Sequence, residues 1–449
     1  MKCSLPLAVL AATFHIHVQA QDFVQSPYQD LGLSSTVVAD FNGDNRPDVL
    51  GIQFGASPNK LVIQLNAGAD SIAFNLKDLN PHFDAMGRPA AGNMDGDQDI
   101  DFVVASGDNL ALQLLLNDGA ANFTVTPLGV SGSNLLQIVD IDKDTDPDIV
   151  GINTIDNTLT IYRNDGSLNF TAQTILSGSD NLEVFAIGDL DNDNDPDIAV
   201  GYYQFTGKQI VLLTNKGDGS FNQTTLVNNN FSSIEGILID DINGDNKNDI
   251  LAIRSFGCTA FLNQGMLSFT QQSLVSASNI VRSFCTGDFN GDGRTDIVLG
   301  TNSAGLFWYK NLSNTTLEFE QGTVGGVSPA FSVVPGDFDN DDDEDLIVSN
   351  GEFWWYDNKI IQEQSSTLNF AERTITLYPN PFTDVIQLTD IGSDAYTVRI
   401  SDLFGRTVFS EKNVSNSIKI GMLAPGTYVL SLINNKTRQA LSMTIVKAR

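Results

Sequence analysis

Histidine and cysteine are nearly absent from this chain of 449 residues, which contains three of each. Cys3 lies in an N-terminal segment that we expect to be removed, so the mature chain keeps only Cys258 and Cys285. So few cysteines exclude a disulfide scaffold and a cysteine-rich zinc site, and leave open one disulfide or two separate buried thiols. The mature chain also keeps a single histidine, His82, so it has no histidine cluster for zinc, copper or iron. His82 follows Asn-Pro, as in a turn, and we expect no catalytic role for it.

Basic residues are also scarce, since 24 Lys and Arg stand against 55 Asp and Glu and leave a formal net charge of −31. A nucleic-acid partner needs an excess of Lys and Arg to neutralise its phosphates, so this class of partner is excluded, as is docking on an anionic membrane surface. Yet 41% of the residues are hydrophobic and only 18% are charged, which is typical of a globular protein rather than a disordered polyanion. The acidic residues must therefore be concentrated in particular places.

Long hydrophobic runs are missing, apart from one at the N-terminus. Residues 1–20 combine an early lysine, an apolar run that starts at Leu5, and small residues at Val18 and Ala20 that fit a cleavage site before Gln21. This order predicts a secretory signal peptide rather than a merely disordered N-terminus. No other segment reaches the roughly 18 apolar residues that span a bilayer, so we expect no transmembrane segment in the mature chain.

The acidic residues that are present form one nine-residue pattern that occurs seven times. The copies begin at Asp40, Asn93, Asp140, Asp189, Asp241, Asp288 and Asp337. A spacing near fifty residues indicates a repeat architecture. The seven copies hold 30 of the 55 acidic residues and only four basic ones, so almost all of the net charge belongs to these short loops.

Each loop is flanked by short β-prone runs, and each repeat then has a strand that ends in Asn and a further strand that often begins with Phe. The repeat Asn residues are Asn66, Asn117, Asn164, Asn215, Asn263, Asn311 and Asn358. Four short strands per repeat predict an all-β, seven-bladed β-propeller over residues 21–358, with an open solenoid as the competing interpretation. The seventh repeat lacks its last strand, and we expect the extra N-terminal strand, Phe23–Tyr28, to replace it and close the ring.

The loops also have the chemistry of a metal site. Positions 1, 3, 5 and 9 are Asp or Asn, and position 7 would add its backbone carbonyl. Alternating hard oxygen ligands on a tight loop suit Ca²⁺ better than Mg²⁺, which demands a stricter octahedron. An EF-hand would need Glu at position 12 between helices, whereas position 12 here is apolar or Gly and lies in a strand. The predicted ligand residues are Asp40, Asn42, Asp44, Arg46 and Asp48; Asn93, Asp95, Asp97, Asp99 and Asp101; Asp140, Asp142, Asp144, Asp146 and Asp148; Asp189, Asp191, Asp193, Asp195 and Asp197; Asp241, Asn243, Asp245, Lys247 and Asp249; Asp288, Asn290, Asp292, Arg294 and Asp296; and Asp337, Asp339, Asp341, Asp343 and Asp345.

A metal-free alternative exists for these loops, namely solvated acidic turns. That alternative explains one such loop well. It explains seven copies with the same ligand register poorly, because packed carboxylates repel one another unless a cation offsets their charge. We therefore predict up to seven structural Ca²⁺ ions.

The pattern D-x-[DN]-x-D-x-x-x-D, followed by an apolar strand and repeated over residues 21–358, resembles the FG-GAP/VCBS repeat family. It is similar to the calcium-binding blades of integrin α-subunit propellers. The resemblance implies that the calcium loops are structural and staple two strands of each blade. The family includes adhesins and carbohydrate-associated domains.

The C-terminal part of the chain differs in pattern. Residues 359–373 are polar and are interpreted as a linker, and the short strands of residues 374–449 are typical of a small Ig-like β-sandwich. The runs YPNP from Tyr378, DLFGR from Asp402 and LAPGTY from Leu423 resemble the type A sorting domain of the type IX secretion system of Bacteroidota. An ordinary C-terminal binding module is the alternative. The resemblance implies that the secretion machinery is a partner, and that the signal peptide and then this domain carry the chain across both membranes, to be released or attached at the outer surface.

Two classes of function fit these features. The first is a surface binding or adhesion module for a glycan or a protein, with no catalysis expected. Trp308, Trp354 and Trp355 offer rings for stacking on a sugar, but they occupy the strand before the repeat Asn, where packing within a blade is the favoured interpretation. The second is a polysaccharide lyase or glycosidase on the same scaffold. A glycosidase needs two carboxylates around the sugar, and outside the loops no acidic residue stands out.

Overall fold

The structure, a computed structural model, describes most of the chain between residues 23 and 447. The described ranges are 23–28, 33–53, 59–68, 74–79, 84–178, 181–204, 207–228, 234–340, 343–350, 352–358, 366–370, 373–378, 382–389, 396–401, 406–414, 417–435 and 440–447. Within these ranges every regular element is a β-strand, which confirms the predicted all-β class. The segments predicted as the signal peptide and the turn with His82 lie outside the described residues, as does Asp341.

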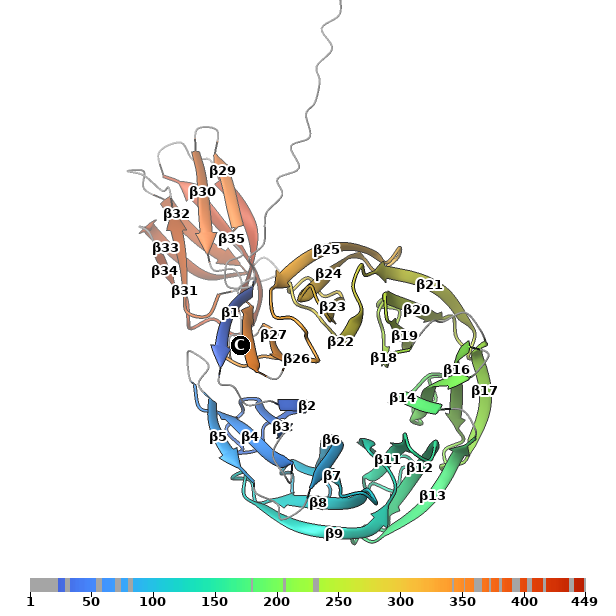
Figure 1. Cartoon of the computed structure of the whole chain (residues 1–449). Helices are drawn as coiled ribbons and strands as arrows, with labels where there is room; N and C mark the ends of the chain where they lie inside the picture. The colour runs from blue at the N-terminus through green and yellow to red at the C-terminus, as the bar shows by residue number, and fades with distance from the viewer. Residues whose placement is uncertain are drawn as a thin grey trace, which may run out of the picture.

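The repeat region forms five four-stranded sheets and one eight-stranded sheet, built from four-stranded antiparallel units. Figure 1 shows the units following one another around a ring, with the first strand of each unit facing the centre. These inner strands are β2 (Leu33–Ala39), β6 (Ala85–Gly92), β10 (Leu135–Val139), β14 (Asn181–Gly188), β18 (Gly236–Asp240), β22 (Val281–Gly287) and β26 (Ser332–Gly336).

The second and third strands of the units show the repeat in its most regular form. Every second strand begins with the Asp at position 9 of a loop: β3 (Asp48–Gln53), β7 (Asp101–Ser106), β11 (Asp148–Asn153), β15 (Asp197–Gln204), β19 (Asp249–Arg254), β23 (Asp296–Thr301) and β27 (Asp345–Ser349). The third strands contain the repeat Asn at or near their end: β4 (Lys60–Asn66), β8 (Ala111–Asn117), β12 (Thr158–Asn164), β16 (Gly207–Asn215), β20 (Gly257–Asn263), β24 (Leu306–Ser313) and β28 (Phe353–Asn358).

The outer strands lie at the rim of the ring and are the most exposed. They are β5 (Phe74–Asp78), β9 (Phe123–Ser131), β13 (Phe170–Ser177), β17 (Phe221–Asn228), β21 (Phe269–Ser276) and β25 (Glu318–Gly325). The outer place beside β28 is taken by β1 (Phe23–Tyr28), which pairs with β28 antiparallel over six residues. The predicted pairing of the N-terminal strand with the last repeat is thus confirmed.

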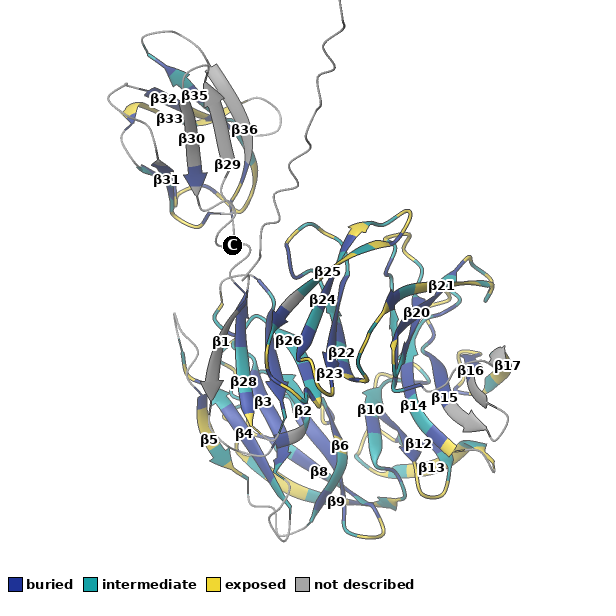
Figure 2. Cartoon of the chain, turned by 45° about the horizontal axis from the view of Figure 1, so that its top comes forward, coloured by how far each residue is buried: buried dark blue, intermediate teal, exposed yellow. Residues whose placement is uncertain are grey.

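The core lies between neighbouring units. Leu50 and Leu61 of one unit, for example, pack with Phe102 and Leu115 of the next, and all four are buried. Because both faces of the second strand are covered in this way, strands such as β7, β11 and β23 are apolar and buried throughout. Figure 2 shows the same gradient, from buried residues in the middle of the units to exposed residues at the rim. Cys258 and Cys285 are free, buried thiols in different clusters. Of the two alternatives left open by the sequence, the structure therefore has two separate thiols and not a disulfide.

The C-terminal segment folds into two antiparallel sheets around one core. One sheet contains β29 (Ser366–Phe370), β30 (Arg373–Tyr378), β31 (Val385–Thr389) and β34 (Ser417–Lys419); the other contains β33 (Thr407–Val414), β32 (Tyr396–Ser401), β35 (Gly426–Asn434) and β36 (Ala440–Lys447). Buried residues of both sheets, such as Ile386 and Leu430, belong to one cluster.

Strand β29 lies inside the segment that the sequence analysis treats as a linker. It pairs with β30 over all five of its residues, so the C-terminal fold begins before residue 374. The polar composition of residues 359–373 hides the β-prone residues Thr367, Leu368 and Phe370, and only the partner strand makes their role visible.

Among the described residues there is no helix with the length and apolar character that a membrane crossing requires.

Candidate metal centres and the repeat asparagines

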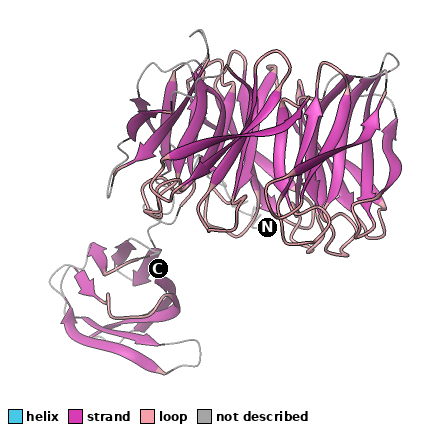
Figure 3. Cartoon of the chain, turned by 90° about the horizontal axis from the view of Figure 1, so that it is seen from below, coloured by secondary structure: helices cyan, strands magenta, loops and turns pink. Residues whose placement is uncertain are grey.

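The acidic loops connect the first strand of each unit to the second. Since the four strands of a unit are antiparallel, these loops and the turns between third and fourth strands emerge at one end of the units, which we call the acidic-loop face. The turns between second and third strands, and the connections to the next unit, emerge at the opposite face. Figure 3 shows loops at both faces of the ring.

Backbone conformation explains why particular residue types recur inside the loops. Position 4 has a positive φ in every loop and position 6 in each loop where it is described, as in Gly43 at +72° and Asn45 at +63°. These left-handed conformations favour Gly and Asn, which are the residues that recur at positions 4 and 6. The bend folds the loop around the side chain at position 1. The carboxylate of Asp40 accepts hydrogen bonds from the backbone N–H groups of Gly43, Asp44 and Asn45 at 2.8, 3.2 and 2.7 Å.

The Asp at position 9 is the buried anchor of every loop. In the first loop one oxygen of Asp48 accepts a hydrogen bond from the backbone N–H of Phe41 at 3.0 Å, and the other accepts from the N–H of Asn66 at 2.7 Å. Burial raises the pKa of Asp48 to about 6, although these hydrogen bonds lower it in part. Burial likewise raises the pKa of Asp249 to about 7 and that of Asp345 to about 8. These carboxylates are therefore held where ionisation is costly unless a cation stands beside them.

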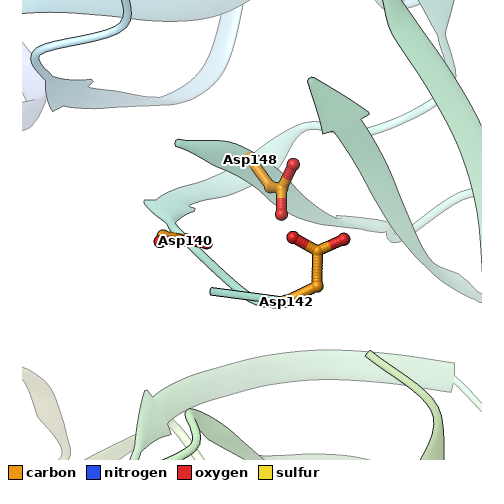
Figure 4. A group of neighbouring side chains, drawn as sticks. All are labelled: Asp140, Asp142 and Asp148. Atoms are coloured by element: carbon orange, nitrogen blue, oxygen red, sulfur yellow. The ribbon is translucent and has the colours of Figure 1, made fainter. Parts of the chain in front are cut away.

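Positions 1, 3 and 9 come together in the third, fourth and seventh loops. In three loops all three residues are Asp, and their carboxylate oxygens lie within 4.8 Å of one another: Asp140, Asp142 and Asp148; Asp189, Asp191 and Asp197; and Asp337, Asp339 and Asp345. Figure 4 shows the carboxylates of Asp142 and Asp148 pointing toward one another. Oδ1 of Asp142 and Oδ1 of Asp191 are buried and have no hydrogen-bond partner among the described residues. An unpaired buried oxygen facing other carboxylates fits the ligand set of a hard cation.

In three loops the side chains at positions 5 and 7 pair with one another. Oδ1 of Asp44 accepts the backbone N–H of Arg46 at 3.0 Å, and its carboxylate also forms an ion pair with the Arg46 guanidinium. The same pair recurs as Lys247 with Asp245 and as Arg294 with Asp292. In these three loops the side chain at position 7 neutralises position 5, so one carboxylate oxygen at position 5 is already engaged by a protein cation.

The third loop has an additional cation that the sequence analysis did not identify. Arg163, in β12, forms an ion pair with Asp142 at position 3 and also donates to the carbonyl of Gly219 at 2.9 Å. Lys143 of the same loop forms an ion pair with Asp195 in the fourth loop. Lys143 therefore joins the third loop to the fourth, and Arg163 joins the third loop to the turn between β16 and β17; both cations contact predicted metal ligands.

The repeat Asn is the residue whose role the sequence did not reveal. In six of the seven repeats, all but that of Asn164, its side-chain N–H group donates to the backbone carbonyl of position 2 in the loop of the preceding unit, 69 to 76 residues away or, at the closure, 272 residues away. Asn215, for example, donates to Ile141 at 2.7 Å, and Asn66 donates to Phe338 at 2.6 Å and so connects the first unit to the last. The sequence shows that this Asn recurs in every repeat. It does not show the role, because the carbonyl that accepts its hydrogen bond lies in another repeat.

The tryptophans pack within the ring, as predicted. Trp308 is buried, and its Nε1–H donates to the carboxylate of Asp296 at 3.0 Å. Trp354 and Trp355 are partly buried against clusters of their own unit and its neighbours. The exposed aromatic side chains among the described residues are two others, Phe256 and Phe331, which sequence reasoning missed because nothing in a single chain distinguishes an exposed Phe from a buried one.

Comparison with known families agrees with both resemblances. The FG-GAP-like repeat matches residues 140–200, 241–299 and 288–348, and the secretion system C-terminal sorting domain matches residues 376–447. No curated protein matches the chain.

Two of the solved structures that match the chain are a lectin and a component of a secretion system. One is a lectin of Agrocybe aegerita, described for specific recognition of non-reducing terminal N-acetylglucosamine, with 16% identity and a TM-score of 0.48 over 92% of this chain and 99% of the lectin chain. The other is PorZ, a surface component of the type-IX secretion system of Porphyromonas gingivalis, with 15% identity and a TM-score of 0.45 over 90% of this chain and 58% of PorZ.

The sorting domain indicates export by the type IX secretion system, to the cell surface or into the medium. The chain therefore combines FG-GAP-like repeats within residues 140–348 with a secretion system C-terminal sorting domain over residues 376–447.

Proposed function

We propose that this protein is a calcium-stabilised, seven-bladed propeller that acts at the cell surface or in the medium as a binding module for a glycan or a protein. Counting β6–β9 and β10–β13 as two blades, joined through a single parallel pair at Arg88 and Leu135, makes each acidic loop part of one blade. The C-terminal sheets would then be the Ig-like sorting module that directs export.

One observation carries the calcium part of this proposal. In three loops the half-buried Asp side chains at positions 1 and 3 converge on the buried Asp at position 9, and Asp142 and Asp191 each have an unpaired buried oxygen in that cluster. Such clusters fit Ca²⁺, which takes six to eight oxygen ligands with flexible geometry. Positions 1, 3 and 9 would hold the ion, with position 5 and the carbonyl of position 7 completing the site. The loops in which Arg46, Lys247 or Arg294 pairs with position 5 would have one ligand oxygen fewer.

The role of such an ion would be structural. It would link the end of the inner strand to the start of the second strand, next to the repeat Asn that reaches the preceding unit. Among the described residues, no constellation of groups outside the loops suggests a reaction, and binding rather than catalysis is the function that we propose.

Calcium is tested by thermal unfolding together with elemental analysis. A ligand that binds only the folded state at a hundred times its Kd stabilises that state by about 2.7 kcal/mol per site, so EDTA should lower the Tm markedly and excess Ca²⁺ should restore it. Asp142→Ala should remove one equivalent of bound calcium, whereas Asp218→Ala, at an exposed acid outside the loops, should leave the calcium content unchanged. An unchanged Tm in EDTA, with no calcium found by elemental analysis, would defeat the assignment.

Incubation of the calcium-loaded protein with plant and algal polysaccharides distinguishes a binding module from an enzyme. Retention without turnover supports a binding module. New reducing ends or unsaturated uronates would instead identify a glycosidase or a lyase.

A further inference from the structure

Exposed apolar side chains occur on both faces among the described residues of the ring, with Met266 and Leu312 on the acidic-loop face, but the two exposed aromatic side chains both lie on the opposite face. Phe256 is 52% exposed in the turn between β19 and β20, and Phe331 is 53% exposed just before β26. Ile280, 37% exposed, precedes β22 between them. All three lie on the opposite face, in consecutive units. These are places where the chain turns and where an aromatic ring serves no packing purpose.

Main-chain hydrogen bonds join these turns into one continuous surface. Val281 N–H donates to the carbonyl of Ser255 at 2.8 Å, which places Ile280 beside the turn with Phe256. Asn302 N–H then donates to the carbonyl of Ile280 at 2.8 Å. The connection to the next unit follows, because Ala330 N–H, next to Phe331, donates to the carbonyl of Thr301 at 3.0 Å. We call the surface formed by Phe256, Ile280, Arg282, Asn302 and Phe331 the aromatic strip.

The space between the two rings is lined by ordered polar side chains. Arg282 is exposed, and its Nε–H donates to the Oδ1 of Asn302 at 3.4 Å. Beside them the hydroxyl of Ser303 donates to the Oδ1 of Asn279 at 2.9 Å. A β-bulge in β22, between Val281 and Ser283, displaces Arg282 from the regular register. Bulges of this kind redirect a side chain, here at the end of an inner strand. The strip therefore consists of two rings with a fixed set of amide, hydroxyl and guanidinium groups between them.

We propose that the aromatic strip binds a polysaccharide chain, with Phe256 and Phe331 stacking on separate sugar rings and Arg282, Asn302 and Asn279 hydrogen-bonding the hydroxyl groups between them. This inference rests on the proposed binding function and names its ligand class and its site. The negative face of an aromatic ring attracts the C–H face of a sugar. Neutral amides and a planar guanidinium suit hydroxyl groups, because the amides both donate and accept hydrogen bonds and the guanidinium donates them in fixed directions.

A protein partner fits this surface less well. Stable protein interfaces bury about 800 Å² per partner around a contiguous apolar centre. Here the two rings lie in turns of different units, and apart from Ile280 the exposed side chains between them are polar. A chain of sugars, with apolar C–H faces separated by hydroxyl groups, matches that alternation.

The strip is tested by affinity electrophoresis of the full chain, in excess calcium, through gels containing laminarin, xylan, alginate or chondroitin sulfate. For any polysaccharide that retards the wild type, Phe256→Ala and Phe331→Ala should each weaken binding roughly tenfold, which corresponds to about 1.4 kcal/mol. The double variant should abolish retardation. Ile155→Ala is the matched control, because Ile155 is an exposed apolar residue in the corresponding turn of another unit, and it should bind like the wild type.

The possible outcomes separate the strip from the general function. If a polysaccharide retards the wild type and the double variant equally, and the Tm of both is the same, the proposal that the aromatic strip is the binding site is wrong, while the proposed binding function stands. If Ile155→Ala weakens binding as much as the Phe variants do, the site is not localised to the strip and the proposal fails. If none of the four polysaccharides is bound, the strip proposal is overturned, and a protein ligand becomes the surviving form of the binding function.

Discussion

At the scale of single residues, the buried amide of Gln64 lies in a place where it makes no hydrogen bond to a described residue. Gln64 in β4 is fully buried, and neither its Nε2 nor its Oε1 has a hydrogen-bond partner among the described residues. It stands two residues before the repeat Asn, where other units place a large side chain such as Tyr162 or Phe261. The hydroxyl of Tyr162 does have partners there, Ser133 and the carbonyl of Ser131.

We expect Gln64→Leu to stabilise the protein, since a buried amide without partners costs about 1–3 kcal/mol and Leu fills nearly the same volume. The change is measured as an increase in Tm and in the free energy of unfolding of the calcium-loaded protein. Gln64→Asn is the control, because it keeps the amide and shortens the side chain, and it should destabilise. A Leu variant that melts at or below the wild-type temperature would show that the amide has a partner, such as an ordered water.

At the scale of elements, the units are held together by a side chain that reaches from one to the next. Asn215 donates to the carbonyl of Ile141 in the preceding unit at 2.7 Å, whereas Asn164 donates only to Pro147 of its own loop among the described residues. Both accept the N–H of a following Gly, Gly217 or Gly166. The two residues thus differ mainly in the contact between units.

This difference gives a matched pair of variants. Asn215→Ala should cost more stability than Asn164→Ala, by about 1–3 kcal/mol, because it leaves the buried carbonyl of Ile141 without its donor. Thermal unfolding in excess calcium measures both. Equal losses would mean that the repeat Asn acts only within its own loop, through the turn that follows it.

The elements also show what the sequence can and cannot predict. The period near fifty residues, the four strands per repeat and the pairing of Phe23–Tyr28 with β28 follow from local patterns, and the structure contains them. The role of the repeat Asn was missed because its acceptor belongs to another repeat. Strand β29 was missed because the composition of its segment is polar, and only its pairing with β30 shows that it is a strand. The convergence of positions 1, 3 and 9 was predicted from spacing, but the engagement of Asp142 by Arg163 depends on a neighbouring strand.

At the scale of the whole molecule, the acidic loops and the exposed aromatic side chains lie on opposite faces of the ring. The acidic residues of the loops gather at the acidic-loop face, and the aromatic strip lies on the opposite face. If all seven loops held Ca²⁺, the formal charge of −31 would fall in magnitude by 14. The ions would then stiffen one face of the ring while the other face is left available for a ligand, so loss of calcium should affect the Tm directly and polysaccharide binding only through unfolding.

Closure of the ring is the other property that belongs to the whole molecule. Strand β1 covers the edge of β28 over six residues, and Phe23, buried at its start, meets the rings of Phe289 and Trp308 edge-on at centroid distances of 6.3 and 6.2 Å. Removal of β1 exposes a strand edge and a piece of core at the same time. An exposed edge is also a template for pairing with other chains.

Deletion of residues 21–30 should therefore lower the Tm sharply and promote association that increases with concentration, as measured by calorimetry and light scattering. Phe23→Ala, which keeps the strand and removes the ring, should cost only part of that stability, because the backbone pairing with β28 persists. A synthetic peptide with the sequence of residues 21–30 should restore the Tm of the deleted protein by adding the missing strand to the free edge. If the deleted protein melts like the wild type and ignores the peptide, the ends of the chain do not close the ring, and its stability must come from contacts between the other units alone.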